Sequence, residues 1–147
     1  MKQEKLNDLI PADKSKVVKY KDGFSWQDTI KKIYKDEPGS WRGVTRTSLI
    51  GGADEVPAPF HLRYFEVEVG GFSSHEKHAH QHIIVVVRGQ AKVTLGDRQE
   101  AVSVGDVVYI APWEVHQFHN PDGPEPFGFL CMVPADRDRP VLVGQGG

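Results

Sequence analysis

Hydrophobic and polar positions alternate along most of the chain from Val44 onward. Short runs rich in β-branched and aromatic residues are separated by Gly, Asp and Pro, which is typical of half-buried strands joined by turns. The expected strands cover residues 44–50, 60–69, 83–88, 91–95, 100–104, 106–110, 115–119 and 127–133. Strands of this length and spacing predict an all-β barrel or sandwich, and the 147 residues suit one domain.

The N-terminal part of the chain follows a different pattern. Residues 1–24 are polar and of mixed charge, which is typical of an extended arm. Ser25 and Asp28 then have the spacing of a capping box. The apolar residues that follow recur at helical intervals: Trp26, Ile30, Ile33 and Tyr34. We therefore expect an arm and a short helix (about residues 26–35) within residues 1–43, a β-barrel over 44–140 and a flexible tail over 141–147.

Composition excludes several classes of partner. The net charge of −2 and the isoelectric point near 6.4 do not provide the excess positive charge that is typical of proteins that bind nucleic acid or an anionic membrane. The longest apolar run, Ile83–Val87, is too short to span a bilayer, and the charged N-terminus does not resemble a signal peptide. The single cysteine, Cys131, cannot form an intramolecular disulfide and fits a reducing compartment. We expect a cytoplasmic protein.

Histidines are concentrated in one short stretch. Four of the seven lie between His75 and His82, directly before the apolar run Ile83–Val87. Imidazoles at alternate positions of a strand point to one face and can converge on a metal ion. A solvated, accidentally histidine-rich edge would explain the stretch alone, but a second histidine segment at residues 116–119 fits the same purpose. The two segments together indicate a metal site.

Residues 70–120 resemble the paired motifs of the cupin superfamily, whose fold is a small antiparallel jelly-roll barrel. The second motif begins at Gly105-Asp106 and has a proline turn. It places His116 eleven residues after the glycine and Asn120 four residues further on, as in the family. The resemblance implies a single jelly-roll domain in which His116 is a metal ligand.

The first motif departs from the family pattern. Counted back from Gly89, the position of the family's glutamate holds His82, and its two histidine positions hold Glu76 and His78. One glutamate and one histidine have thus exchanged places. The resemblance implies one divalent transition metal with the ligands Glu76, His78, His82 and His116. Such nitrogen and oxygen donors suit Mn, Fe, Co, Ni or Zn, and the resemblance favours Mn.

His80 competes for a place in this set. A straight strand rises about 3.3 Å per residue, so residues 76 and 82 would lie roughly 20 Å apart, whereas ligand bonds are about 2 Å long. The chain must therefore turn between them, and the family pattern puts His80 at that turn. A second register uses His78, His80 and His82 as ligands and leaves Glu76 as an acid or base. We expect His75 and His119 to be supporting or surface residues and His61 to be structural.

Cys131 lies in the segment Phe127–Val133, which is apolar on both faces, so alternation does not say which way the thiol points. An unpaired cysteine in such a strand is commonly a small core residue. In several small cupins with a Phe-Leu-Cys segment at this place, however, the thiol faces the metal. The resemblance therefore implies a second role for Cys131, as a nucleophile.

The chain is most similar to a subgroup of single-domain cupins that includes the manganese-dependent 1-methylthio-xylulose 5-phosphate methylsulfurylases. The shared segments are Arg63-Tyr64-Phe65-Glu66, Gly70-Gly71, Glu76-Lys77-His78, Gln117-Phe118, Phe129-Leu130-Cys131 and Asp136-Arg137-Asp138-Arg139-Pro140. The resemblance implies a metal-dependent lyase or sulfur transferase that acts on a small oxygenated substrate, with Cys131 as sulfur acceptor. The alternatives are an Fe(II)-dependent dioxygenase and a non-catalytic binding module.

A phosphorylated substrate would need basic side chains near the mouth of the barrel. Arg42, Arg46, Arg63 and Lys92 are candidates, but we expect each to be a solvated surface charge. Cupins often pair through their sheets, so the resemblance also implies a homodimer.

Overall fold

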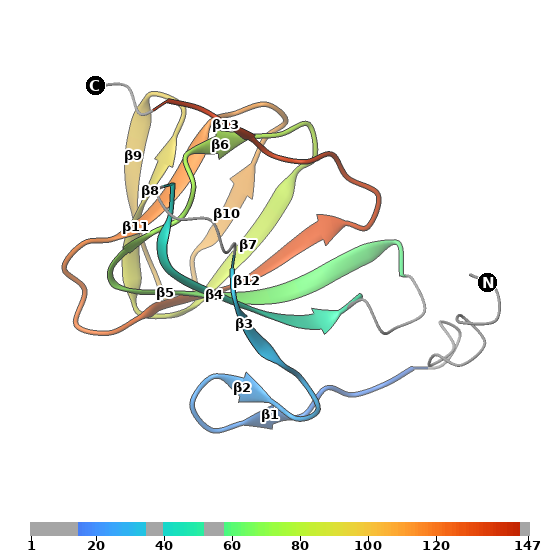
Figure 1. The fold of residues 1–147 in the computed structure, drawn as a ribbon. Coiled ribbons are helices and arrows are strands. Elements are labelled where there is room, and N and C mark those ends of the chain that lie inside the picture. Colours follow the sequence, from blue (N-terminus) through green and yellow to red (C-terminus); the bar gives the residue numbers. More distant parts are fainter. Residues whose placement is uncertain (1–14, 35–39, 52–57, 145–147) are drawn as a thin grey trace.

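The computed structural model describes residues 15–34, 40–51 and 58–144, and every regular element in them is a β-strand (Figure 1). In chain order the strands are β1 (Tyr20–Lys21), β2 (Ser25–Trp26), β3 (Lys31–Ile33), β4 (Arg42–Ile50), β5 (Phe60–Phe72), β6 (Glu76–Lys77), β7 (His82–Arg88), β8 (Gln90–Leu95), β9 (Arg98–Ser103), β10 (Val107–Ile110), β11 (His116–Asn120), β12 (Phe127–Pro134) and β13 (Val141–Leu142). No helix in the described part of the chain is long and apolar enough to cross a membrane.

One curled antiparallel sheet forms the body of the molecule. Among the described residues it has eleven strands, while β1 and β2 pair only with each other. The long strand β5 joins the two halves, since it pairs with β4 and β12 along most of its length and with β11 at Gly71 and Phe72. The sheet therefore curls into a jelly roll (Figure 1). The all-β jelly-roll barrel predicted from the sequence is confirmed.

The interior is filled from alternate positions of these strands. In β12, Phe127, Phe129 and Cys131 are buried whereas Met132 is 40% exposed. In β7, Ile84 and Val86 are buried and Ile83 is half exposed. Since successive side chains of a strand point to opposite faces, one face of each strand builds a single core. This alternation settles what the sequence left open, because Cys131 points inward.

β5 extends beyond its predicted end. The sequence indicates a turn at Gly70-Gly71, yet the strand continues to Phe72. Gly71 lies so close to the carbonyl oxygen of Arg42 that a Cβ atom would collide with it, and Gly70 has φ of +83°. The two glycines thus allow a close backbone crossing inside a strand instead of ending it.

The predicted helix over residues 26–35 is wrong for the described residues 26–34. Trp26 ends β2, and residues 31–33 form β3, which pairs with β4. Asp28 has φ of 60°, in the left-handed region, which interrupts a right-handed helix. Ile30 and Ile33 are each 72% exposed, so the apolar residues do not share one buried face. Tertiary contacts therefore override the helical spacing.

The β1–β2 hairpin lies outside the barrel, at the lower edge of Figure 1. The rings of Phe24 and Trp26 pack on Tyr64 at centroid distances of 6.2 and 5.0 Å. The Tyr64 hydroxyl donates to Glu66 at 2.9 Å, and Arg88 bonds the same carboxylate at 3.0 Å. Arg88 also lies 4.7 Å above the Phe24 ring. These contacts fasten the hairpin to the outer face of β5.

The C-terminal end of the chain is partly ordered against the barrel. Val141 and Leu142, which the sequence assigns to a flexible tail, form β13 and pair with β6. The backbone amide of Val143 donates to the carbonyl oxygen of His75 at 2.9 Å. The last residues of the predicted tail, 145–147, lie outside the described residues.

Candidate metal centre

The predicted turn between Glu76 and His82 is present. Strand β6 ends at Lys77, the chain bends at Ala79 and His80, and β7 begins at His82. Both backbone amides of the bend donate to one carboxylate, that of Asp138, at 2.7 and 2.9 Å. This bend returns the chain on itself, so residues that a straight strand would separate face the same cavity.

Three imidazoles meet at this point. His78 lies just after β6, His82 opens β7 and His116 opens β11. One ring nitrogen from each lies within 4.8 Å of the others. His78 and His116 are buried, with exposed fractions of 1% and 3%. The three histidines are therefore positioned to bind a metal ion.

Hydrogen bonds fix which nitrogens are available to an ion. The Nδ1 atom of His78 lies 2.6 Å from the carbonyl oxygen of His80, and the Nδ1 atom of His116 lies 3.0 Å from that of Glu114. A carbonyl oxygen only accepts, so each Nδ1 carries the proton and each neutral ring has a bare Nε2. These two Nε2 atoms face each other at 3.2 Å. Two facing lone pairs repel unless a cation lies beside both, so the arrangement fits a bound metal.

The pKa shifts of these rings favour the same state. Burial, and after it the charge of His116, lowers the pKa of His78 from 6.5 to about 4. Burial also lowers the pKa values of His82 and His116. Histidine binds a metal through a neutral ring, so the pocket holds all three ready for coordination near neutral pH.

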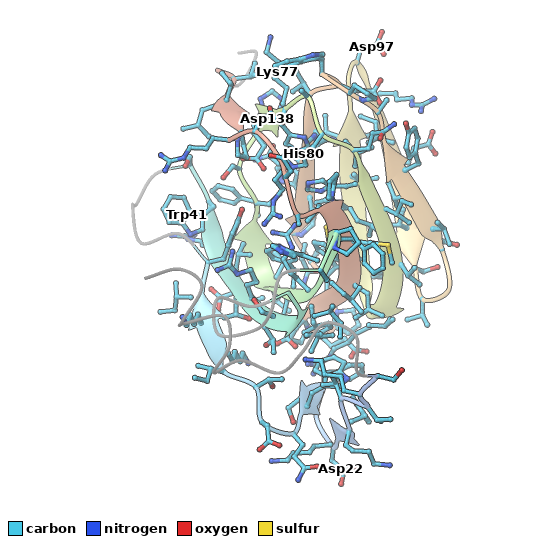
Figure 2. The ribbon with its side chains drawn as sticks, turned by 90° about the vertical axis from the view of Figure 1, so that its right-hand side faces the viewer. Asp22, Trp41, Lys77, His80, Asp97 and Asp138 are labelled. Carbon is cyan, nitrogen blue, oxygen red and sulfur yellow. The ribbon has the colours of Figure 1, made fainter. Side chains whose placement is uncertain are left out.

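His80 is a close neighbour of this group. Its Nδ1 atom lies 2.9 Å from Asp138 Oδ1, and its Nε2 atom lies 3.1 Å from Nε2 of His82. Figure 2 shows Asp138 and His80 side by side. Hydrogen bonds from the Ala79 amide and from His80 lower the pKa of Asp138. The carboxylate therefore keeps the proton of His80 on Nδ1 and turns its bare Nε2 towards the site.

Glu76 lies on the wall of the same cavity. It is buried, pairs with His116 across β6 and β11, and lines the inner cavity together with His82 and His116. Its negative charge raises the pKa values of His78 and His116, which offsets part of the effect of burial. The two registers that the sequence left open thus share His78 and His82 and differ in whether Glu76 or His80 completes the set.

Cys131 faces the same cavity from β12. Its Sγ atom lies 3.5 Å from Nδ1 of His82 and 3.4 Å from Nη2 of Arg63. Burial raises the pKa of the thiol, whereas the positive charge of Arg63 lowers it. A neutral His82 that binds an ion through Nε2 carries its proton on Nδ1 and can donate it to the sulfur. The thiol is therefore next to the ligand cluster, as the family resemblance implied.

Arg63 does not lie at the surface. The prediction of a solvated surface charge at this position is wrong, because Arg63 is buried and only 6% exposed. The guanidinium packs 4.9 Å above the ring of Phe65, two residues along the same face of β5. Alternation with Phe65 and Val67, both core residues, is the sequence signal that could have placed it inside.

Two cavities that share part of their lining surround these residues. The inner one, of about 40 Å³, is lined by residues that include His82, His116 and Cys131. The outer one, of about 370 Å³, is lined by residues that include Arg46, Arg137 and Asp138. Arg63, Glu76 and His82 line both. A small ligand in the outer cavity can thus contact Arg63 and His82, which lie beside the thiol. The sequence-based predictions give no role to Arg137 or Asp138.

The three remaining histidines form hydrogen bonds outside the cluster. His75 bonds the carbonyl oxygen of Val143 at 3.0 Å, and His119 bonds the side chain of Gln117 at 2.8 Å. His61 accepts a hydrogen bond of 3.0 Å from Arg137. Among the described residues, none of the three belongs to the cluster of ring nitrogens.

The chain is similar to a known protein family and to solved structures of that family. The model of the family described as "Cupin domain" matches residues 63–133. A crystal structure of a cupin-2 domain from Rhodospirillum rubrum is 37% identical and superposes with a TM-score of 0.75, over 86% of this chain and 83% of that one. This chain belongs to the cupin family. Another cupin 2 barrel protein, from Rhodopseudomonas palustris, is 34% identical over 88% and 87% of the two chains, with a TM-score of 0.76.

One curated relative of this cupin has a named activity. The 1-methylthio-D-xylulose 5-phosphate methylsulfurylase of Rhodospirillum rubrum is 39% identical over 120 residues. The match covers 81% of this chain and 74% of the relative. The family match over residues 63–133 includes both parts of the histidine cluster as well as Cys131.

Proposed function

We propose that this cupin is a metal-dependent enzyme that removes the methylthio group from a 1-methylthio ketose phosphate, with Cys131 as nucleophile. The observation that carries the proposal is the position of the Cys131 Sγ atom, 3.5 Å from a ring nitrogen of His82 in the metal-binding cluster. A relative at 39% identity with the name of this activity supports it.

Four residues would hold the metal ion. His78, His82 and His116 supply nitrogen atoms, and we propose the buried carboxylate of Glu76 as the fourth ligand. A donor set of three imidazoles and one carboxylate suits Mn²⁺, which is our choice among the divalent ions. Such an ion is a Lewis acid that draws electron density onto the carbonyl oxygen of a bound ketose.

The chemical step transfers the methylthio group from C1 of the substrate to the sulfur of Cys131. The Cys131 sulfur attacks the methylthio sulfur, a sulfur–sulfur bond forms, and the bond from that sulfur to C1 breaks. The electron pair of the broken bond passes to C1 and is delocalised onto the neighbouring carbonyl, and C1 then takes up the proton lost by the thiol. The products are a 1-deoxy ketose phosphate and a methyl disulfide on Cys131. A free thiol as co-reactant reduces this disulfide and restores Cys131.

Two neighbours prepare the thiol for attack. Arg63 places a positive charge 3.4 Å from the sulfur, which stabilises the thiolate. The Nδ1–H group of His82 can donate to the same sulfur, which lies 3.5 Å away. Part of the wall of the inner cavity is apolar, with Phe65, Phe118 and Phe129, and the cavity has a volume of only about 40 Å³, which leaves little room for water beside the thiol. The free thiol that the cycle requires is also the reason why we propose a cytoplasmic location.

The experiment that tests this function follows both the product and the protein. Manganese-loaded protein is incubated with 1-methylthio-xylulose 5-phosphate, first without and then with a thiol. We expect one methylthio adduct on Cys131 by mass spectrometry in the first case and repeated turnover in the second. Cys131→Ser should bind metal normally and lose both signals. Full turnover by Cys131→Ser, or activity only with redox iron and oxygen uptake, would contradict the proposal.

A further inference from the structure

The outer cavity contains a group of arginines, which we call the arginine vestibule: Arg46, Arg63 and Arg137. All three line the cavity of about 370 Å³, which shares Arg63, Glu76 and His82 with the inner cavity beside Cys131. They come from β4, from β5 and from the segment after β12, so only the folded barrel brings them together. Arg46 and Arg63 are close enough to Arg137 to lower its pKa, in addition to the effect of burial.

The positive charge of the vestibule is not balanced by carboxylates. Among the described residues, none of the three arginines has an acidic side chain within ion-pair distance. Two acidic residues, Glu76 and Asp138, line the same cavity, against four arginines once Arg139 is included. Asp138 already binds the amides of the bend and His80, and Glu76 lies on the wall shared with the inner cavity. The vestibule therefore attracts an anion.

One buried donor in the vestibule also lacks an acceptor among the described residues. The Nε atom of Arg63 is fully buried and has no hydrogen-bond partner in the described structure, while its Nη2 atom contacts Cys131. A buried donor without an acceptor costs about 1–3 kcal/mol, and more if it is charged, so native structures rarely keep one without a use. Arg63 therefore lines the cavity with a guanidinium whose hydrogen-bonding capacity the described residues do not fully use.

Arg137 and Arg46 are already held in place at the rim. The Nη1 atom of Arg137 donates to the carbonyl oxygen of Pro134 at 2.8 Å and to Nδ1 of His61 at 3.0 Å. These bonds occupy one side of the guanidinium and leave its Nη2 edge for a ligand. Arg46 lies 5.4 Å above the ring of Tyr34, which also lines the cavity. Fixed planar guanidinium groups are well suited to bind phosphate oxygens in pairs.

We propose that the arginine vestibule binds the phosphate group of the substrate and so directs the other end of the molecule to Cys131 and the histidines. The ligand class is a phosphate monoester, and Arg137 and Arg46 are its main contacts, with Arg63 between the phosphate and the thiol. This inference rests on the proposed function for its substrate, but the binding of phosphate itself does not depend on the reaction.

The first experiment measures binding of inorganic phosphate to metal-loaded protein by calorimetry. We expect binding to the parent chain, and an affinity roughly tenfold to a hundredfold lower in Arg137→Gln and Arg46→Gln, the range for the loss of a charged hydrogen bond. Arg98→Gln, an exposed arginine at the start of β9, removes the same charge outside the vestibule and should bind as the parent does. Thermal unfolding and metal content show that each variant is folded, and Arg137→Lys replaces Arg137→Gln if the latter is not.

Three results would separate this inference from the proposed function. No phosphate binding, or equal binding by Arg137→Gln and Arg98→Gln, overturns the vestibule. Binding that disappears only when the metal is removed also overturns it, because the phosphate then lies on the ion. Phosphate binding that is sensitive to Arg137, with no turnover of the methylthio ketose phosphate, supports the vestibule and contradicts the proposed function. Where turnover occurs, Arg137→Gln should raise KM by about tenfold or more and change metal content little.

Discussion

The Nη2 atom of Arg63 lies 3.4 Å from the Sγ atom of Cys131, and the two residues are register partners on the adjacent strands β5 and β12. Partners in an antiparallel pair point to the same face of the sheet, so both side chains enter the barrel together. The barrel thus buries a thiol and supplies, from the neighbouring strand, the charge that offsets the effect of burial on its pKa.

Removal of this charge should make the thiol less acidic. The guanidinium stabilises the thiolate, so Arg63→Gln should raise the pKa of Cys131 and move the pH profile of its alkylation by iodoacetamide to higher pH. Arg63→Lys keeps the charge and should stay nearer the parent profile. Arg98→Gln serves as control and should not move it. An unchanged profile in folded Arg63→Gln would mean that Arg63 does not act on the thiol.

Loss of one histidine of the cluster should cost metal binding. His116→Ala removes a bare Nε2 that faces His78 at 3.2 Å, and we expect the affinity for Mn²⁺ to fall by at least about a hundredfold, above the usual effect of outer residues. His119→Ala is the matched control, because His119 lies on the same strand and bonds Gln117 instead. Equal affinities for Mn²⁺ in the two variants, measured by titration calorimetry, would rule out the cluster as the metal site.

The two candidates for the fourth ligand can be told apart by substitution. If Glu76 binds the ion through oxygen, Glu76→Gln should weaken Mn²⁺ binding more than His80→Gln does. The electron paramagnetic resonance spectrum of bound Mn²⁺ should also change in Glu76→Gln. The opposite order would favour the register with His80 as ligand, in which Asp138 orients that ring through the bond of 2.9 Å.

The protein without metal should become less stable as the pH falls below about 6.5. Burial lowers the pKa of His78 to about 4, so between pH 6.5 and 4 the unfolded chain binds this proton and the folded chain does not. The free energy of unfolding therefore decreases as the pH falls through this window, by up to about 3 kcal/mol for His78 alone. Urea titrations of chelator-treated protein at pH 7 and pH 4.5 measure the difference. His78→Phe lacks this proton-binding group, so its free energy of unfolding should decrease less between pH 7 and pH 4.5. A pH dependence equal to that of the parent protein would contradict the assignment to His78.

Gly128 should not tolerate a side chain while Tyr64 is in place. A Cβ atom at this position would collide with the Tyr64 hydroxyl, so Gly128→Ala should destabilise the fold by roughly 1–3 kcal/mol. In a Tyr64→Ala background the same substitution should cost much less, because the neighbour is gone. Chemical denaturation of the four proteins gives the coupling. Additive effects would show that the collision is relieved elsewhere.

The periodicity of the sequence determined much of the fold. Alternation at period two and Gly or Asp turns are local signals, so the strands from β4 to β12 could be recognised, apart from the two-residue β6. This succeeds because strand direction and turn position are encoded within a few residues. The frame counted from Gly89 singled out His78 and His82, the second motif singled out His116, and the structure brings these three rings together.

The tertiary structure decided what local spacing cannot express. Trp26, Ile30 and Ile33 have helical spacing, yet β3 pairs with β4 and the hairpin packs on Tyr64, because contacts across the sheet outweigh a weak local preference. The orientation of Cys131 was undetermined because its strand is apolar on both faces. Arg46, Arg63 and Arg137 come from three separate segments of the chain, and only the folded barrel brings them to one cavity. Charges interact according to their distance in space and not in sequence, so these residues act as one site only in the folded protein.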